Sequence, residues 1–163
     1  LHRVPCCGFL FREKPSLPHI KREMIDFYKI PHYAINSIKQ GADWTTPEGD
    51  IIPNHRLVFA GDAPRSYAYC SDTAYNPSLC ETLKGVNLLY HEATFAEDMA
   101  DRARLVGHST ARQAAQIARA AEVGKLLLGH FSARYEDETV LLQEAQEVFP
   151  NAILAHEGLC ISL

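Results

Sequence analysis

Long apolar runs, glycine and proline are all scarce in this 163-residue sequence. No run approaches the roughly 20 apolar residues that a membrane-spanning helix needs, so no membrane segment is expected. No basic segment followed by an apolar one stands at the start, so no secretion signal is predicted. Gly and Pro number 9 each, which argues against a collagen-like or disordered chain. The composition, 47% hydrophobic and 22% charged, is typical of a globular protein.

Paired cysteine motifs are missing as well. The five cysteines are an odd number and include no Cys-x-x-Cys spacing: Cys6, Cys7, Cys70, Cys80 and Cys160. Most of them lie in apolar runs, which favours buried free thiols over structural disulfides. Because free thiols are typical of a reducing compartment, we expect a cytoplasmic protein.

The sequence also lacks an excess of positive charge. The formal net charge is −4, so the overall charge does not indicate a nucleic-acid-binding protein. A polyanionic substrate would need a local basic cluster or metal ions to hold it. Lys21, Arg22, Lys29 and Lys39 form a modest basic group, for which a solvated helix face is the simpler interpretation.

The order of the expected elements indicates an α/β fold. Apolar segments predict strands over residues 3–12, 67–70, 86–90, 125–128, 152–155 and 159–163, and a hairpin between 44–45 and 51–52. Helices are predicted over residues 20–28, 33–39, 111–122 and 137–148, and over a segment that carries Phe95 and Met99. Thr110 and Gln113 have the spacing of a capping box before the alanine-rich helix. Strands that alternate with helices predict a sheet buried on both faces.

Three of the expected strands end in a short polar cluster. These clusters are Ser71-Asp72-Thr73, His91-Glu92 and Gly129-His130-Phe131-Ser132. In α/β folds the loops at strand ends converge on one edge of the sheet, so these side chains are expected to lie together. His108, just before the Thr110 cap, stands at a helix N-terminus.

Convergence of these residues would build a metal site with acid–base groups beside it. The candidates are His2, Asp72, His91, Glu92, His108 and His130. Imidazole and carboxylate suit zinc or a similar divalent ion, and a carboxylate is able to bridge two metals. Such a pair activates a bound water and clamps the oxygens of a phosphodiester. A Glu–His pair outside the metal shell could supply the proton for the leaving oxygen.

Structural interpretations of the same residues remain open at this point. A single histidine at a strand end is more often a hydrogen-bonded structural residue than a ligand. Asp72 suits a turn, and Glu92 suits the first turn of a helix. Ser132 and Arg134 suit a cap and a solvated charge. No His-x-His or His-x-x-x-His pair is present.

Taken together, the motifs resemble ribonuclease Z, the tRNA 3′-processing endoribonuclease of the metallo-β-lactamase superfamily. The motifs that carry the resemblance are Ser71-Asp72-Thr73, His91-Glu92-Ala93-Thr94-Phe95, Gly107-His108-Ser109-Thr110 and Gly129-His130-Phe131-Ser132-Ala133-Arg134-Tyr135, with Leu1-His2-Arg3-Val4-Pro5 before them. The resemblance implies that residues 1–163 are the C-terminal half of the enzyme domain. The implied fold is half of an αββα sandwich, a mixed sheet with packed helices.

The resemblance also implies a role for each matching residue. His2 would complete the first zinc site, Asp72 would bridge both zinc ions, and His130 would serve the second. Glu92 and His108 match the pair that gives a proton to the leaving oxygen. Ser132 and Arg134 match the segment that holds RNA phosphate. The implied reaction is zinc-dependent removal of the 3′ trailer of precursor tRNA, leaving a 3′-hydroxyl, in a homodimer.

The sequence departs from the family pattern in two places. The His-x-His-x-Asp-His motif, which supplies most zinc ligands, is absent and is expected upstream of residue 1, because the chain starts with Leu1 rather than Met. Residues 28–40 lack the Gly-Pro-rich arm with which many relatives clamp tRNA.

Two other functions compete with precursor-tRNA cleavage. One is another phosphodiesterase of the same superfamily that acts on a nucleotide-like ester. The other is a non-catalytic fragment or assembly module, since this half alone lacks most zinc ligands and is expected to be inactive.

Overall fold

The computed structural model describes residues 5–163, and it divides into two compact units. One unit combines the N-terminal residues up to Arg12 with Arg65–Leu163, and the other is Glu13–Pro64. Asp72, Glu92, His108, His130, Ser132 and Arg134, all predicted as site residues from the sequence, belong to the first unit.

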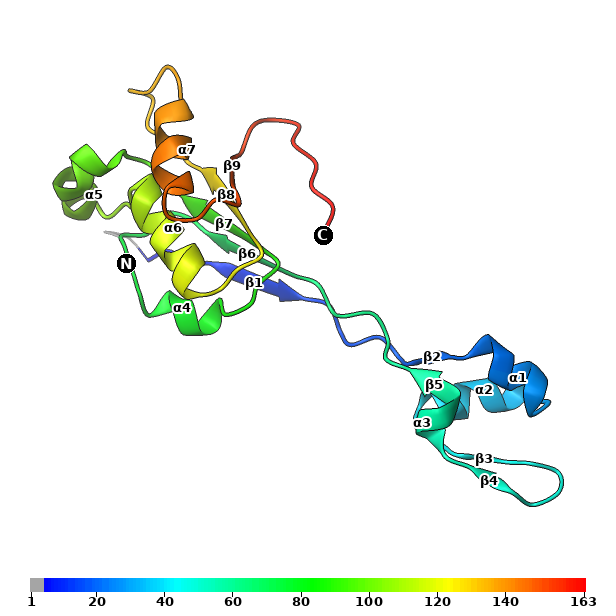
Figure 1. Ribbon diagram of the computed structural model, residues 1–163. Helices are drawn as coiled ribbons and strands as arrows, with labels where there is room; N and C mark the ends of the chain where they lie inside the picture. Colours follow the sequence, from blue (N-terminus) through cyan, green and yellow to red (C-terminus); the bar gives the residue numbers. More distant parts are fainter. Residues whose placement is uncertain (1–4) are drawn as a thin grey trace. The chain divides into compact units, whose positions relative to one another are not determined.

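A five-stranded sheet with the order β1-β6-β7-β8-β9 forms the centre of the first unit (Figure 1). The strands are β1 (Phe9–Arg12), β6 (Ser66–Cys70), β7 (Leu88–Glu92), β8 (Lys125–Gly129) and β9 (Ala152–Leu154). β1 pairs antiparallel with β6, and the other four strands run parallel. The mixed sheet predicted from the sequence is therefore confirmed.

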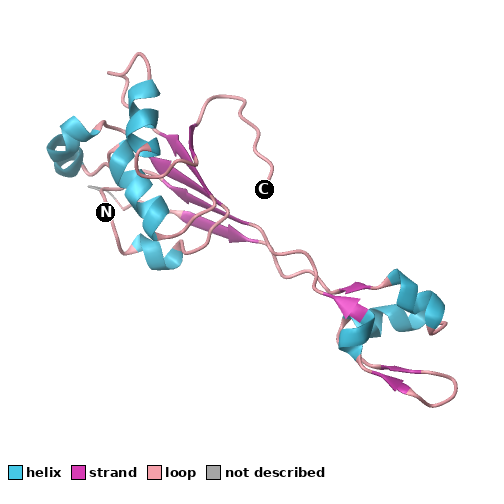
Figure 2. Cartoon of the chain, viewed as in Figure 1, coloured by secondary structure: helices cyan, strands magenta, loops and turns pink. Residues whose placement is uncertain are grey.

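Helices cover one face of this sheet (Figure 2). The helical elements are α4 (Leu79–Thr82), the 3₁₀ helix η1 (Glu97–Met99), α5 (Ala100–Val106), α6 (Ala111–Ala120) and α7 (Thr139–Gln146). α6 contacts β7 and β8, and α7 contacts α6 and β9. Ala68, Leu89 and Leu126 lie on the covered face and are fully buried. This core places the ends of β6, β7 and β8 in a fixed relation.

The alanines of α6 explain how closely this helix lies on the sheet. Ala111, Ala114, Ala115 and Ala118 are all fully buried, and Ile117 is the one large side chain among the buried residues of this helix, so small side chains dominate its buried face. The predicted capping box is present: Thr110 Oγ1 accepts from the Gln113 N–H, and Gln113 Oε1 accepts from the Thr110 N–H. The cap satisfies two backbone donors that would otherwise be unpaired at the helix start.

The opposite face of the sheet is aromatic and is not buried as the sequence had predicted. Phe9 and Phe11 are 53% and 59% exposed. The Phe11 ring stacks on Tyr67, and Tyr69 stacks on Tyr90 at a centroid distance of 4.6 Å. The alternation of side chains along β6 puts Ala68 on the helix-covered face and both tyrosines of that strand on the open face.

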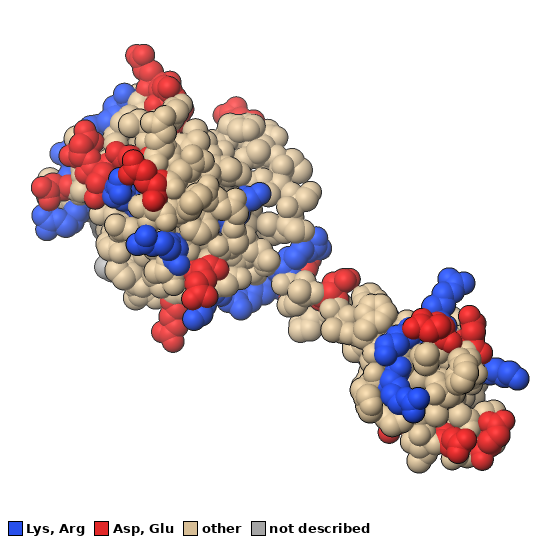
Figure 3. Space-filling view, in the orientation of Figure 1, with Lys and Arg blue, Asp and Glu red and all other residues tan. Residues whose placement is uncertain are grey.

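The second unit is small and has a separate core. Its elements are β2 (His19–Ile20), α1 (Arg22–Phe27), α2 (His32–Lys39), β3 (Trp44–Thr45), β4 (Ile51–Ile52), α3 (Asn54–Leu57) and β5 (Val58–Phe59). Both predicted helices and the predicted hairpin of β3 and β4 are confirmed. Ile38 and Leu57 are the most deeply buried side chains of this core. Acidic and basic side chains are intermingled on the face of each unit drawn in Figure 3.

Several predicted boundaries were wrong. β7 continues through His91 and Glu92, because Glu92 still pairs with Gly129 of β8 and its carboxylate is satisfied inside the protein. The helix expected to carry Phe95 and Met99 excludes Phe95, which forms a bridge with Thr110. Helical structure begins with η1, which contains Met99, and continues as α5 from Ala100. The expected strand over 159–163 is irregular, and residues 5–8 precede the first strand, which begins at Phe9.

The cysteines also differ from the expectation. All five are free thiols, but Cys6, Cys7 and Cys160 are exposed and only Cys70 is buried. Burial raises the pKa of the Cys70 thiol to about 11. Within residues 5–163, no helix has the length and apolar character needed to cross a membrane.

Candidate metal and acid–base site

Three neighbouring strands carry the candidate site residues to one edge of the sheet. Asp72 lies two residues beyond β6, Glu92 is the last residue of β7, and His130 follows β8 directly. Because these strands are parallel and in register, with Cys70 opposite His91 and Glu92 opposite Gly129, their carboxyl ends meet at the same edge. The convergence predicted from the sequence is therefore observed for these three residues.

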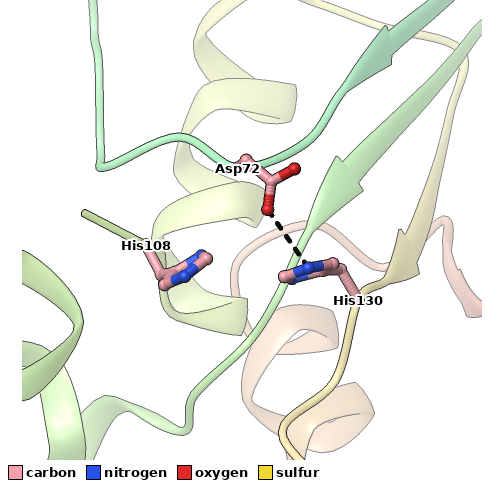
Figure 4. Close-up of side chains that lie close together, drawn as sticks. All are labelled: Asp72, His108 and His130. Carbon is pink, nitrogen blue, oxygen red and sulfur yellow. Dashed lines mark ion pairs between the residues drawn. The ribbon is translucent and has the colours of Figure 1, made fainter. Parts of the chain in front are cut away.

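Asp72 and His130 adopt an unusual backbone conformation. Both have positive φ, 50° for Asp72 and 59° for His130, which is uncommon for residues other than glycine. The left-handed turn at each strand end directs the two side chains toward one another (Figure 4). His130 Nε2 lies 3.2 Å from Asp72 Oδ1. Strained backbone of this kind is concentrated at functional sites.

His108 completes a group of three. α5 ends at Val106, and the following Gly107, with a φ of 85°, reverses the chain direction. The His108 N–H donates to the Ala103 carbonyl. The His108 ring stacks on the His130 ring with a centroid distance of 5.3 Å. One ligand atom from each of Asp72, His108 and His130 lies within 4.8 Å of the others.

Glu92 lies beneath this group and is fully buried. Its carboxylate accepts hydrogen bonds from the backbone N–H of Thr73 at 2.5 Å and of Ser109 at 3.0 Å. The Thr94 hydroxyl lies 2.6 Å from Oε2, and His108 Nδ1 lies 3.0 Å from Oε1. Four donors thus surround the carboxylate, as a buried charge requires. The predicted Glu92–His108 pair is in direct contact.

Gly129 allows the strand end to form. A Cβ at this position would stand 2.3 Å from the Tyr90 hydroxyl oxygen, so any side chain there would collide with the Tyr90 ring. Burial raises the pKa of Tyr90 to about 12, with a further contribution from the nearby Tyr69. Tyr90 therefore remains a neutral phenol that packs over the glycine preceding His130.

His91 faces away from the site, into the helix-covered core. It is fully buried, and its Nδ1–H donates to the Glu92 carbonyl at 2.8 Å. Burial lowers the pKa of His91, an effect that this hydrogen bond opposes. Its Nε2 has no hydrogen-bond partner within the described part of the chain. His91 is therefore a neutral core residue, outside the cluster for which the sequence had made it a candidate.

Ser132 and Arg134 lie on the loop that leaves His130. The Ser132 N–H donates to the Thr94 carbonyl, and Arg134 Nε donates to Ser132 Oγ at 3.1 Å. The Arg134 guanidinium lies over the Phe95 ring at 5.0 Å from its centroid. A stacked, exposed guanidinium beside a hydroxyl presents several donors to an anion.

Sequence reasoning missed two residues that contribute to the site. Thr94 and Ser109 both contact Glu92, and each belongs to a quoted motif in which it was given no role of its own. The only sequence signal for either residue was a hydroxyl side chain close to the end of a strand, for Thr94, or to the start of a helix, for Ser109. His2 was predicted as a zinc ligand, and it lies outside the described residues.

The donor set fits a divalent metal. Two imidazoles and one carboxylate are ligand types that zinc prefers, and the three side chains bring one ligand atom each within 4.8 Å of the others. His130 and Asp72 are each half-exposed, at 41% and 45% of the side-chain surface, so the group is open to an ion and to substrate.

Comparison with known proteins identifies the class of fold. The chain aligns with the crystal structure of the metallo-β-lactamase fold protein YhfI from Bacillus subtilis at a TM-score of 0.55 and 28% identity. The alignment covers 58% of this chain and 39% of that protein. The mixed α/β architecture and this alignment define a metallo-β-lactamase-type fold. No family model matches the sequence.

Sequence comparison identifies more similar relatives than the structure comparison does. Proteins named Ribonuclease Z from Bacteroides thetaiotaomicron and from Bacteroides fragilis strain YCH46 are 59% and 60% identical to it over 162 residues. Ribonuclease Z from Porphyromonas gingivalis strain W83 is 49% identical over the same length. The alignments cover 99% of this chain, which spans about half the length of these curated relatives. The chain is homologous to ribonuclease Z, and the resemblance predicted from its motifs is confirmed.

Proposed function

We propose that the protein containing this chain is a zinc-dependent endoribonuclease that removes the 3′ trailer of precursor tRNA and leaves a 3′-hydroxyl. The single observation that carries the proposal is the high identity to ribonuclease Z across the whole chain. The site geometry supports it, because the residues that match the family motifs meet at one edge of the sheet.

The metal-binding part of the site would use Asp72 and His130, together with His2. Asp72 has two carboxylate oxygens, so it is able to bridge the two zinc ions expected in an intact site. When bound, the zinc ions would lower the pKa of a bound water and stabilise charge on the phosphodiester oxygens. The remaining ligands would come from the part of the relatives that this chain does not span.

The acid–base part would use Glu92 and His108. His108 Nδ1–H donates to the buried Glu92 carboxylate, which fixes the orientation of the ring. Nε2, on the other side of the ring, then points toward the open group formed with Asp72 and His130. In the proposed reaction a water oxygen joins phosphorus and the water loses its proton to the solvent. The bond from phosphorus to the 3′-oxygen breaks, and Nε2 gives its proton to that oxygen.

Ser132 and Arg134 would hold an RNA phosphate close to the bond that is cut. The Arg134 guanidinium is restrained on both sides, by the Phe95 ring and by Ser132 Oγ. A restrained guanidinium loses less conformational freedom when it binds phosphate. Precursor tRNA is thus the proposed partner, and a cytoplasmic homodimer is the proposed assembly.

The test is to incubate the full-length protein with a precursor tRNA that carries a 3′ extension. The expected products are tRNA with a 3′-hydroxyl directly after the discriminator base and a separate trailer. Bis-p-nitrophenyl phosphate serves as the small comparison substrate. Rapid turnover of that ester with no cleavage of precursor tRNA would overturn the proposal in favour of a small-molecule phosphodiesterase.

A further inference from the structure

Thr94 contacts both the acid–base part of the site, at Glu92, and the metal-binding part, at His130. Its hydroxyl oxygen lies 2.6 Å from Glu92 Oε2 and 3.0 Å from His130 Nδ1. It also lies 3.0 Å from the His130 carbonyl and 3.4 Å from His108 Nδ1. Thr94 is 7% exposed, so protein groups rather than water surround the hydroxyl.

We propose that Thr94 is a positioning residue that holds His130 in the tautomer protonated at Nδ1, which leaves the Nε2 lone pair directed at the metal position beside Asp72. The proposal rests on the proposed function, because it assigns His130 to metal binding. It adds a link from the buried Glu92 carboxylate, through the Thr94 hydroxyl, to that ligand.

The count of protons determines the direction of each hydrogen bond. A threonine hydroxyl has one proton and two lone pairs. The carboxylate of Glu92 is both the nearest acceptor and the charged one, so it receives the proton ahead of the His130 carbonyl. The oxygen of Thr94 then faces His130 Nδ1 with a lone pair, and Nδ1 must carry a hydrogen to avoid repulsion between two acceptors.

The tautomer has a consequence on the other side of the ring. With Nδ1 protonated, neutral His130 has its lone pair on Nε2, which lies 3.2 Å from Asp72 Oδ1. A lone pair and a carboxylate oxygen at this distance repel one another unless a cation or a proton lies between them. The arrangement therefore suits a bound cation, and the negative charge of Glu92 relayed through Thr94 makes Nε2 a stronger donor to it.

The backbone keeps Thr94 in register with His130. The Ala93 N–H donates to the Gly129 carbonyl at 2.8 Å, and the Ser132 N–H donates to the Thr94 carbonyl at 3.1 Å. These bonds join the segments after β7 and β8 on either side of the hydroxyl. Replacing the hydroxyl by a methyl group therefore removes the relay and leaves the backbone connections in place.

Two substitutions in the full-length protein separate this role from simple packing. Thr94→Val has nearly the same shape and no hydroxyl, whereas Thr94→Ser keeps the hydroxyl and loses a methyl group. Thr139→Val is the matched control, since it removes a threonine hydroxyl bonded to a carboxylate, Asp137, at the start of α7.

The readouts are the His130 tautomer, from long-range ¹H–¹⁵N correlation spectra of the zinc-loaded protein, and zinc affinity, from competition with a chelator. We expect an Nδ1–H tautomer in the wild-type protein. Thr94→Val should lower zinc affinity by about 10–100-fold, the effect usual for loss of an outer hydrogen-bond partner. Thr94→Ser and Thr139→Val should keep wild-type affinity.

An Nε2–H tautomer in the wild-type protein would overturn the proposal without any variant, so it remains testable even where Thr94→Val fails to fold. Unchanged zinc affinity in folded Thr94→Val, or an equal loss in Thr94→Ser, would also overturn it. Neither readout uses RNA. A protein that shows the expected tautomer and zinc affinities but leaves precursor tRNA uncut would retain this inference and refute the proposed function.

Discussion

Asp72 and His130, 58 positions apart in the chain, hold their side chains 3.2 Å apart, Oδ1 to Nε2, from two strands that are not neighbours in the sheet. β7 lies between β6 and β8. Its last residue, the buried Glu92, accepts from the N–H of Thr73, next to Asp72, and from the Thr94 hydroxyl, which contacts His130. The positive φ of Asp72 and of His130 brings their side chains across the end of β7. The site is thus built from three strand ends and the loop before α6.

Loss of the Glu92 carboxylate should slow the chemical step more than it weakens substrate binding. Glu92→Gln keeps the size of the side chain but removes the carboxylate that accepts from His108 Nδ1 and orients its ring. We expect kcat for precursor tRNA to fall by about 10²–10⁴-fold, the usual contribution of acid–base catalysis, with little change in KM. Steady-state kinetics of the full-length protein would measure both constants, and an unchanged kcat would exclude this pair as the proton source.

His91 should make the fold sensitive to mild acid. Burial lowers its pKa from the ordinary value of 6.5, so the folded state favours the neutral ring and the unfolded chain takes up the proton first. The free energy of unfolding should therefore be intact above about pH 6.5 and decline as the pH falls below it, by at most about 1.4 kcal/mol per pH unit from this group. Denaturant unfolding at pH 7.5, 6 and 5 gives the measurement.

The control for that experiment is His91→Gln, which has no titratable group at this position. Its stability should change less between pH 7.5 and pH 5 than that of the wild-type protein. A wild-type protein whose pH dependence equals that of His91→Gln would show that the buried imidazole is not responsible.

The alanine face of α6 should not accept a larger side chain. Ala118 is fully buried against the core, so Ala118→Leu should lower the free energy of unfolding by about 1–3 kcal/mol through overpacking. Ala120→Leu on the same helix is exposed and should change stability little. Equal effects of the two substitutions in denaturant unfolding would contradict the packing described for this helix.

The open aromatic face should make the 163-residue chain self-associate when it is produced alone. Phe11 is 59% exposed within a row of stacked rings, and apolar patches of this kind drive association. Sedimentation velocity should show dimers or larger species, and Phe11→Lys should shift them toward monomer. Phe27→Lys removes a ring from the second unit that is still more exposed, at 74%, and should have no such effect. A monomeric wild-type chain at high concentration would refute this prediction.

The sequence was sufficient to predict the α/β class, the helix α6 with its cap, and the meeting of Asp72, Glu92 and His130 at one sheet edge. Apolar runs and cap residues are local signals, so they were visible without the structure. The end of β7 was misplaced because His91 and Glu92 look like loop residues, whereas each is buried on an opposite face of the strand. The role of Thr94 depends on distances between three segments, which no local pattern contains.

The sequence also did not predict the open sheet face or the division of the chain into two units. Tyr67 and Tyr69 look like core residues in a sequence, and only the arrangement of helices shows that they lie on the uncovered face. The segment Glu13–Pro64 contains ordinary helix and hairpin signals, and nothing in its composition marks it as a separate compact unit.

The most direct test of the metal assignment is zinc content and precursor-tRNA cleavage by full-length Asp72→Ala, measured beside the wild-type protein. Asp101→Ala, which removes an exposed carboxylate paired with Arg104 on α5, is the control. Asp72→Ala should lose bound zinc and at least about 100-fold of its cleavage rate, more than loss of an outer partner would cost, while Asp101→Ala keeps both. An Asp72→Ala protein with full zinc content and full activity would contradict the account.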